Sequence, residues 1–357
     1  MLATTVARQI KYDFPGSNLS WMIAAFCKDI IRENPHVDEV IVTDAVAKND
    51  IVAFRKLKKK LLKEKKAGVW DEVFITHNMD ANLALYDGTV RGMILRAYPF
   101  PITVPIQPVL QLNSDEKEHV REYAHNHKLG QFRNVILWEF APQSGQTLLG
   151  FELVKKVAER VTSRPDTCII LSSARAFNSS SQVLDGSKLS IRENAGLTHY
   201  CNLLIGCSSG ITWLSTSSAS KQLPMLQLLD PGAFFLNAPS VDFKRYDLAT
   251  NELVELIDFN EEKLEIIINH ILDKGIVSAK EKFNQELPMQ FKTTRKIVYN
   301  LLCYLQFGAI KKHYLVTTSV YGKNPLFTRQ FLLGIFSFPF KLIANKFRKW
   351  FTSSPGK

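Results

Sequence analysis

The sequence has few cysteines, no long apolar run and, toward its end, no acidic residues. Its 357 residues include five cysteines, an odd number with no C-x-x-C pair and no histidine at zinc-ligand spacing. We therefore expect neither a disulfide framework nor a metal site, and we expect the protein to reside in a reducing compartment. The first residues do not show the positively charged region, apolar region and cleavage site of a signal peptide. We therefore expect a protein that is not secreted through a signal peptide.

The acid-free tail carries the net charge. Residues 287–357 contain 12 of the 45 basic residues and none of the 34 acidic ones, so the chain before them is nearly neutral. Within residues 324–351 the longest uncharged run, residues 330–340, is shorter than the ~20 residues of a membrane span. Phenylalanine and leucine interleaved with lysine and arginine favour a segment lying in the interface of an anionic bilayer. A terminal helix packed on the body is the alternative, and no recognised motif accompanies the charge to support nucleic-acid binding.

Apolar strands and amphipathic helices alternate along the body. In the second half, strands are expected at 134–140, 167–173, 202–206 and 224–229, and helices at 147–161, 189–201 and 210–222. In the first half, helices are expected at 4–14, 28–34 and 50–68, and strands at 18–26, 38–44 and 71–77. This alternation predicts parallel sheets with right-handed crossovers, in two Rossmann-like α/β domains. The first domain begins with a helix, so we expect its central strand to be missing.

The predicted domains are separated by a proline-rich stretch and a helix. Residues 100–112 contain three prolines and are expected to cross the surface without regular structure. The next helix is expected to have Ser114 as its N-cap, with Asp115 and Glu116 in the first turn. We expect a first domain at 1–130, a second at 131–275 and a helical, basic tail at 276–357.

Two turns between a strand and a helix are rich in small residues. In parallel α/β sheets such turns bind ligands, because the following helix presents free N–H groups to an anion. Two turns in one domain suit the two phosphates of a nucleotide diphosphate. Ordinary β/α turns also favour glycine and serine, and neither stretch is a P-loop or dinucleotide fingerprint. The candidate residues are Ser144, Gly145 and Gln146 in the first turn, and Gly206, Ser208, Ser209, Gly210 and Ile211 in the second.

Three stretches resemble glycosyltransferase family nine, the ADP-heptose:lipopolysaccharide heptosyltransferases. They are "VARQIKYDFPGSNLSWMIA", "IIRENPHVDEVIVTD" and "SIRENAGLTHYCNLLIGCSSGITWLSTSSASKQLPMLQLL". The similarity runs from residue 1 to about residue 275. It implies a GT-B fold, with two Rossmann-like domains facing a cleft and the nucleotide-sugar donor in the second. It also implies that neither a metal nor another cofactor is needed.

The sequence departs from the family at two places. In the second turn Ser208 stands where the family often has Asp, Ser209 replaces Thr, and Trp213 occupies the usual His position, while Gly210 is kept. The family also begins with a strand and a Gly-Asp turn, whose Asp resembling enzymes use as catalytic base. Both are expected to be absent here.

Other residues are candidates for the missing roles. His77, Asp80 and Asp44 follow predicted strands and could act as base, although strand ends often carry such residues as caps. Glu139 could reach the donor ribose or be a solvated carboxylate. Trp213 could stack on a nucleotide base or a sugar, or its side chain could face the core. Cys207 could be a nucleophile, but we expect it to be a small buried residue.

The resemblance therefore implies an inverting glycosyltransferase that needs no metal. It would move a sugar from a nucleotide-diphosphate sugar to a lipopolysaccharide-core or other surface-glycan acceptor. The tail would hold it on the cytoplasmic face of the bacterial inner membrane. The alternative is a catalytically impaired, membrane-associated protein that binds nucleotide sugars.

Overall fold

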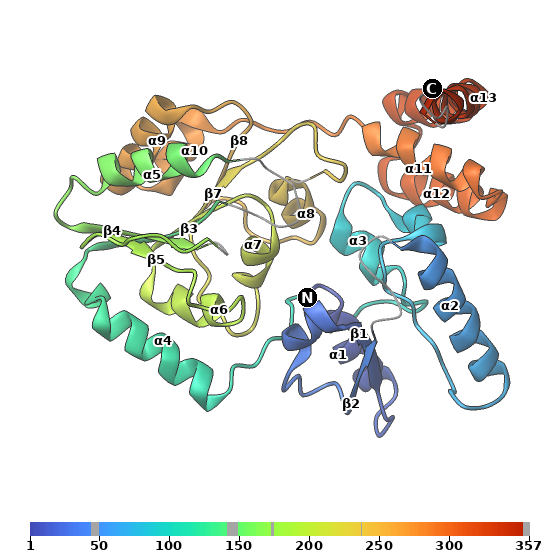
Figure 1. Ribbon diagram of the computed structural model, residues 1–357, viewed down its shortest axis with the longest axis horizontal. Helices are drawn as coiled ribbons and strands as arrows, with labels where there is room; N and C mark the ends of the chain where they lie inside the picture. Colours follow the sequence, from blue (N-terminus) through green and yellow to red (C-terminus); the bar gives the residue numbers. More distant parts are fainter. Residues whose placement is uncertain (44–49, 141–148, 173–174, 237, 353–357) are drawn as a thin grey trace, which may run out of the picture. The chain divides into compact units, whose positions relative to one another are not determined.

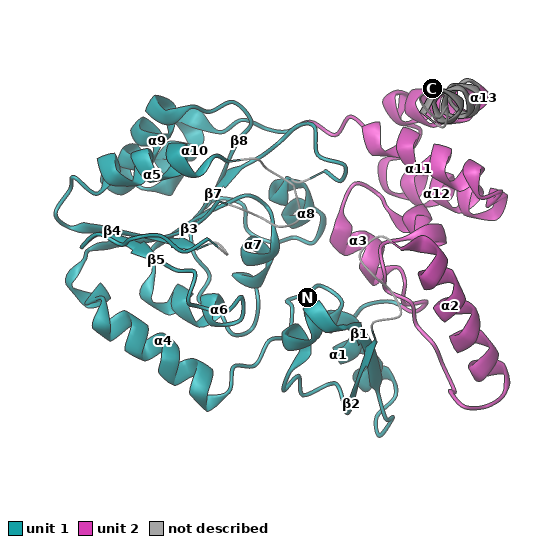
Figure 2. Cartoon of the chain, viewed as in Figure 1, with its two compact units in different colours: residues 1–45, 101–287 teal, residues 46–100, 288–357 magenta. Residues whose placement is uncertain are grey.

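The computed structural model describes residues 1–43, 50–140, 149–172, 175–236 and 238–352, with side chains up to residue 339. The chain forms two compact units (Figure 2). Unit 1 consists of Met1–Ala45 and Pro101–Leu287, and unit 2 of Val46–Phe100 and Pro288–Lys357. These units divide the chain elsewhere than near residues 130 and 275, and the expected domain boundaries remain predictions.

A six-stranded parallel sheet forms the centre of unit 1 (Figure 1). Its strands lie in the order β5-β4-β3-β6-β7-β8, and every neighbouring pair is parallel. The strands are β3 (Asn134–Glu139), β4 (Thr167–Ser172), β5 (Val183–Asp185), β6 (Leu203–Gly206), β7 (Met225–Leu228) and β8 (Leu253–Leu256). Numbered from β3, this order is 3-2-1-4-5-6, the doubly wound arrangement of dinucleotide-binding folds.

Side chains of β3 alternate between two apolar cores, one on each face of the sheet. Ile136 and Trp138 enter the first core, and Val135 and Leu137 the second. The first core is completed by α5 (Phe151–Val161), α9 (Glu261–Lys274) and α10 (Ile276–Phe283). The second is completed by α4 (Ser114–Asn126), α6 (Glu193–Leu197), α7 (Gly210–Leu214) and α8 (Pro239–Arg245). Burial on both faces explains why these strands are continuous apolar runs.

The four strands expected in the second half of the sequence are confirmed, while several helices are shorter than expected. Residues 189–201 form α6 and the 3₁₀ helix η4 (Thr198–Tyr200), and residues 210–222 contain only α7. Serine and threonine hydroxyls after α7 bond to local carbonyl groups, as Ser215 Oγ does to Thr212 O at 2.7 Å. These bonds satisfy backbone groups in a turn and compete with helix extension.

The first 45 residues add a small parallel sheet to unit 1. It pairs β1 (Ser20–Ala24) with β2 (Glu39–Thr43), flanked by α1 (Thr4–Asp13) and the 3₁₀ helix η1 (Ala25–Ile31). The helix expected at 28–34 is therefore a 3₁₀ helix that begins earlier. The proline-rich stretch has no regular structure, but α1 anchors it. The Thr5 hydroxyl donates to Ile106 O at 3.0 Å, and Gln9 Oε1 accepts from Thr103 N at 2.7 Å.

Helix α4 has Asn113 as its N-cap, so the assignment of that role to Ser114 is wrong. The Asn113 side-chain oxygen accepts from Glu116 N at 2.8 Å, and the Glu116 carboxylate accepts from Asn113 N at 3.0 Å. This reciprocal capping box satisfies two backbone donors, which a serine cap at the next position would not do.

Described residues of unit 2 form helices and no strand. They are α2 (Ile51–Lys66), η2 (Asp80–Leu85), α3 (Val90–Leu95), α11 (Lys292–Cys303), α12 (Phe307–Tyr321) and α13 (Pro325–Thr352). The strand expected at 71–77 is absent because these residues have no neighbouring strand to supply hydrogen-bond partners. None of the helices that the structure describes has the length and apolarity that a bilayer span requires.

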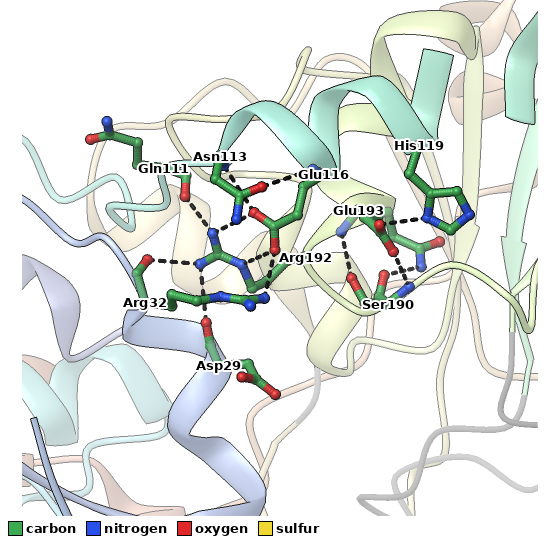
Figure 3. Close-up of polar contacts among 10 residues, drawn as sticks. Asp29, Arg32, Gln111, Asn113, Glu116, His119, Ser190, Arg192 and Glu193 are labelled. Atoms are coloured by element: carbon green, nitrogen blue, oxygen red, sulfur yellow. Dashed lines mark hydrogen bonds and ion pairs between the residues drawn. The ribbon is translucent and has the colours of Figure 1, made fainter. Parts of the chain in front are cut away.

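A buried arginine connects the first 45 residues to the helices under the large sheet (Figure 3). The Arg192 guanidinium, just before α6, donates to both carboxylate oxygens of Glu116 at 2.7 and 2.8 Å. Its other N–H groups donate to the carbonyl oxygens of Asp29, Arg32 and Gln111 at 2.5 to 3.0 Å. Arg192 is fully buried, so all five of its donors are satisfied inside unit 1.

Candidate functional site

The strand order indicates a candidate site at the carboxyl ends of β3 and β6. These two strands are neighbours, with Trp138 opposite Ile205, and their crossover connections leave in opposite directions across the sheet. In open parallel sheets, ligands bind at this switch point, beyond the carboxyl ends of the strands. Glu139 ends β3, and Cys207 to Gly210 follow β6, so the structure brings these predicted site residues together.

Glu139 lies at the centre of this site and is buried, not solvated. Its Oε1 accepts hydrogen bonds from the Ser209 hydroxyl and from Ile211 N, the latter at 3.4 Å. Burial raises the pKa of Glu139, although these hydrogen bonds favour the ionised form. The turn donors first assigned to a ligand phosphate are thus already bonded to a carboxylate of the protein itself.

The turn after β6 is fixed by a glutamine from the neighbouring strand. Ser208 has a left-handed backbone (φ 53°), and its N–H donates to Gln227 Oε1 at 2.8 Å. The Thr212 hydroxyl donates to the same oxygen at 3.1 Å. A Cβ at Gly206 would lie 2.4 Å from Thr212 Oγ1, so the close packing of this turn requires glycine. Sequence reasoning missed Gln227, whose signal was a lone polar residue inside the apolar run 224–229.

Three polar atoms at the site are buried without a hydrogen-bond partner among the residues that the structure describes. They are Glu139 Oε2, Ser208 Oγ and Gln227 Nε2, and their side chains are at most 5% exposed. Buried polar atoms without partners are costly, so such a group of atoms needs an explanation, and a ligand that bonds to them is one. A carboxylate oxygen accepts from sugar hydroxyls, while the serine hydroxyl and the amide N–H can donate to oxygen atoms. The set therefore suits a ligand with both hydroxyl groups and acceptor oxygens.

The remaining predicted residues of this turn take part in packing. Ile211 belongs to the second core of the sheet, and half-buried Trp213 packs against that core, with its ring centroid 6.3 Å from that of Phe243. The Cβ of a residue replacing Gly210 would lie 3.2 Å from Ile191 Cδ1. Buried Cys207 donates its thiol to the carbonyl of Glu139 at 3.3 Å. Ser144, Gly145 and Gln146 lie outside the described residues.

Two of the three candidate bases, His77 and Asp80, belong to unit 2. Asp80 is buried with a left-handed backbone (φ 56°), and its Oδ1 accepts from Arg55 Nε at 2.9 Å and from Gln306 Nε2 at 2.7 Å. Burial opposes ionisation, but these bonds outweigh it and hold the pKa of Asp80 below its usual value. The Arg55 guanidinium also covers the Tyr304 ring at 3.9 Å. Asp80 is thus held in a tertiary contact between the two segments of unit 2.

His77 has a more open setting than Asp80. Its ring lies 4.9 Å from the Phe54 ring, centroid to centroid, and its pKa is lowered by burial. A lowered pKa leaves the imidazole neutral and able to accept a proton at pH 7. Asp44, the third candidate base, lies outside the described residues. Within the described parts of the chain, no group of three His, Cys, Asp or Glu side chains could hold a metal ion.

Comparisons with known proteins agree with this architecture. No protein-family model matches the chain, and a search of curated proteins gives no match. The chain is similar to the crystal structure of a glycosyl transferase of family 9 from Veillonella parvula. The two share 17% identity over 77% of this chain and 86% of the other, with a TM-score of 0.52. The structure of an E. coli ADP-heptose lps heptosyltransferase II matches with 15% identity over 76% of this chain and 94% of that one, with a TM-score of 0.47.

At these identities the likeness is one of fold. The fold class is α/β with parallel sheets, as in the Veillonella glycosyl transferase of family 9. The resemblance to this family, expected from the sequence, is therefore confirmed at the level of structure.

Proposed function

We propose that this protein is a glycosyltransferase that binds a nucleotide-diphosphate sugar at the carboxyl ends of β3 and β6. The observation that carries the proposal is the group of three buried, unpartnered polar atoms at the switch point of the sheet. Glu139 Oε2 would accept from a ribose or sugar hydroxyl. Ser208 Oγ and Gln227 Nε2 would donate to oxygens of the diphosphate or sugar. The fold shared with a family 9 glycosyl transferase supports this choice of ligand.

The reaction proposed is inverting and independent of metal. Ser208 Oγ and Gln227 Nε2, the donors of the site that are not already bonded to the protein, would stabilise the charge that develops on the leaving diphosphate. The acceptor would be a lipopolysaccharide-core or other glycolipid glycan, reached from the cytoplasmic face of a bacterial inner membrane, with the C-terminal tail on the anionic bilayer. His77 is the better candidate base of the two described, because Asp80 is occupied by Arg55 and Gln306.

The occupied state of Asp80 also favours a second candidate, a nucleotide-sugar-binding protein without transfer activity. General-base catalysis contributes about 10²- to 10⁴-fold to a rate, so a chain without a base would still bind its donor. The two candidates share the donor site and differ only in turnover.

Calorimetric titration of the full chain with UDP- and ADP-sugars tests the donor site. The E139Q variant should weaken binding about 10- to 100-fold, because a charged hydrogen bond contributes about 1.5–3 kcal/mol. The matched control is E255Q, which alters an equally buried carboxylate on β8 that bonds to Ser240. Absence of binding by any nucleotide sugar, or equal losses in both variants, would contradict the proposed site. Binding without transfer to any glycolipid acceptor would favour the binding protein.

A further inference from the structure

The charge of the chain is divided unequally between the two compact units. Unit 2 contains 23 basic and 6 acidic residues, and unit 1 contains 22 basic and 28 acidic residues. The net charges are therefore +17 and −6, which together give the +11 of the whole chain. The basic character extends beyond the C-terminal tail, because residues 46–100 contribute 11 of the 23 basic side chains.

Helix α2 presents part of this charge as a stripe. Lys56, Lys59, Lys63 and Lys66 are spaced by three and four residues and are all exposed, so they lie on one face of the helix. None of the four forms an ion pair with a residue that the structure describes. Lysines elsewhere on the helix do have acidic partners, as Lys65 has in Glu72 at 2.5 Å. The stripe is a row of uncompensated positive charges.

Helix α13 has one packed face and one open face. Phe327 is fully buried, Phe331 packs on Tyr314 at 5.2 Å between ring centroids, and Gly334 packs closely against Val298 of α11. The open face carries Leu326, Leu333 and Phe336, which are 37% to 66% exposed. A hollow of about 570 Å³ along this helix is lined mainly by basic and apolar side chains, among them Lys323, Arg329, Leu332, Leu333 and Phe336.

We propose that unit 2 as a whole is a docking module for an anionic lipid bilayer. The open face of α13 enters the headgroup region with its leucines and phenylalanine, and the lysine stripe of α2 attracts the anionic headgroups. Exposed apolar side chains next to lysine and arginine match the chemistry of a bilayer interface. An RNA backbone would match the positive charge but would provide no apolar environment in which the exposed leucines could be buried. This inference extends the membrane role proposed for the tail and rests on that proposal for the choice of partner.

Flotation of the full chain with lipid vesicles tests this docking surface. The vesicles are phosphatidylcholine alone or phosphatidylcholine with 30% phosphatidylglycerol, an anionic lipid, at low and physiological salt. The chain should float with the anionic vesicles and stay behind with the neutral ones. The variant K56Q/K59Q/K63Q/K66Q should lose at least about tenfold in binding, because each basic residue near the surface attracts the bilayer. The variant L326S/L333S/F336S should also bind the anionic vesicles at least about tenfold less. This loss should depend less on salt than the loss in the lysine variant, because it removes apolar contacts and not charge.

The matched control removes the same charge from unit 1. The variant K117Q/R133Q/K188Q/K274Q alters four exposed basic residues of that unit and should bind within about twofold of the unaltered chain. Equal losses in the control and the α2 variant would overturn the proposal, as would equal binding to neutral vesicles. The proposal would also be overturned, in favour of RNA binding, if poly-uridine RNA released the chain from the vesicles and the variant L326S/L333S/F336S bound the vesicles as well as the unaltered chain. Flotation requires no sugar transfer, so failure here is distinguishable from failure of the proposed donor site.

Discussion

Replacing Arg192 by methionine tests how strongly unit 1 depends on its buried ion pair. Methionine keeps the unbranched aliphatic stem and removes the guanidinium. The change leaves the Glu116 carboxylate without two bonds of 2.7 and 2.8 Å, and three carbonyl oxygens lose their donors. Glu116 is itself 6% exposed, so water cannot fully replace the lost partner.

The expected cost follows from removing the buried partner of Glu116, which leaves its carboxylate only the half-exposed Arg32. Breaking a buried pair by removing one partner costs about 3–5 kcal/mol. The matched control is Arg32→Met, because Arg32 reaches the same carboxylate at 2.8 Å but its side chain is 47% exposed. An exposed pair contributes about 0–1 kcal/mol, so the control should cost far less.

Urea denaturation at pH 7 and at pH 3.5 measures both effects. Hydrogen bonds from Arg192 outweigh the effect of burial and hold the pKa of Glu116 below its usual value. A lowered carboxyl pKa contributes stability above the unfolded value of about 4.3, and this contribution is lost as the pH falls through the folded value. The difference between Arg192→Met and the unaltered chain should therefore shrink at acid pH. A cost below about 1 kcal/mol at pH 7, or equal costs for both arginines, would refute the reasoning.

Three further substitutions probe the candidate residues. Gly206→Ala should cost about 1–3 kcal/mol by overpacking, since its Cβ would lie 2.4 Å from Thr212 Oγ1, and an unchanged urea midpoint would contradict this. Asp80→Asn should lower the unfolding free energy by about 1–2 kcal/mol, because the bonds from Arg55 lose their charged acceptor. Since the pKa of Asp80 is lowered in the folded chain, this cost should become smaller in acid. A cost that does not change with pH would argue against this role of the Asp80 charge. The raised pKa of Glu139 means that its ionisation destabilises the folded chain above about pH 4.3. The unfolding free energy of Glu139→Gln should therefore decline less than that of the unaltered chain between pH 5 and 8. Parallel pH profiles would count against a buried, destabilised carboxylate.

Periodicity predicted the sheet of unit 1 because its strands obtain all their partners within one stretch of sequence. Each of the strands expected at 134–140, 167–173, 202–206 and 224–229 is an apolar run, and burial on both faces of a parallel sheet produces such runs. The same reasoning failed at residues 71–77, where apolar side chains are present but a neighbouring strand is not. A strand depends on its partner as well as on its own sequence, and periodicity reports only the latter.

The candidate site was predicted in part. Its glycines and serines were visible because turns that pack closely exclude larger side chains. The contact between Glu139 and Ser209 was not, because it joins positions on separate strands and depends on the order in which β3 and β6 pair. Gln227 was missed for the same reason: its role appears only when β7 is known to lie beside β6.

Unit 2 is assembled from two segments separated by roughly 190 residues of unit 1. At synthesis rates of about 5–20 residues per second, the first segment emerges from the ribosome some 10–40 seconds before the second begins to be made. The six strands of the large sheet lie between the two segments and can pair during this interval. The 3₁₀ helix η2 of the first segment, by contrast, must wait for the second segment before Asp80 can meet Gln306. Folding of the nascent chain is therefore expected to finish with unit 2, although its first segment is made before the strands of the large sheet.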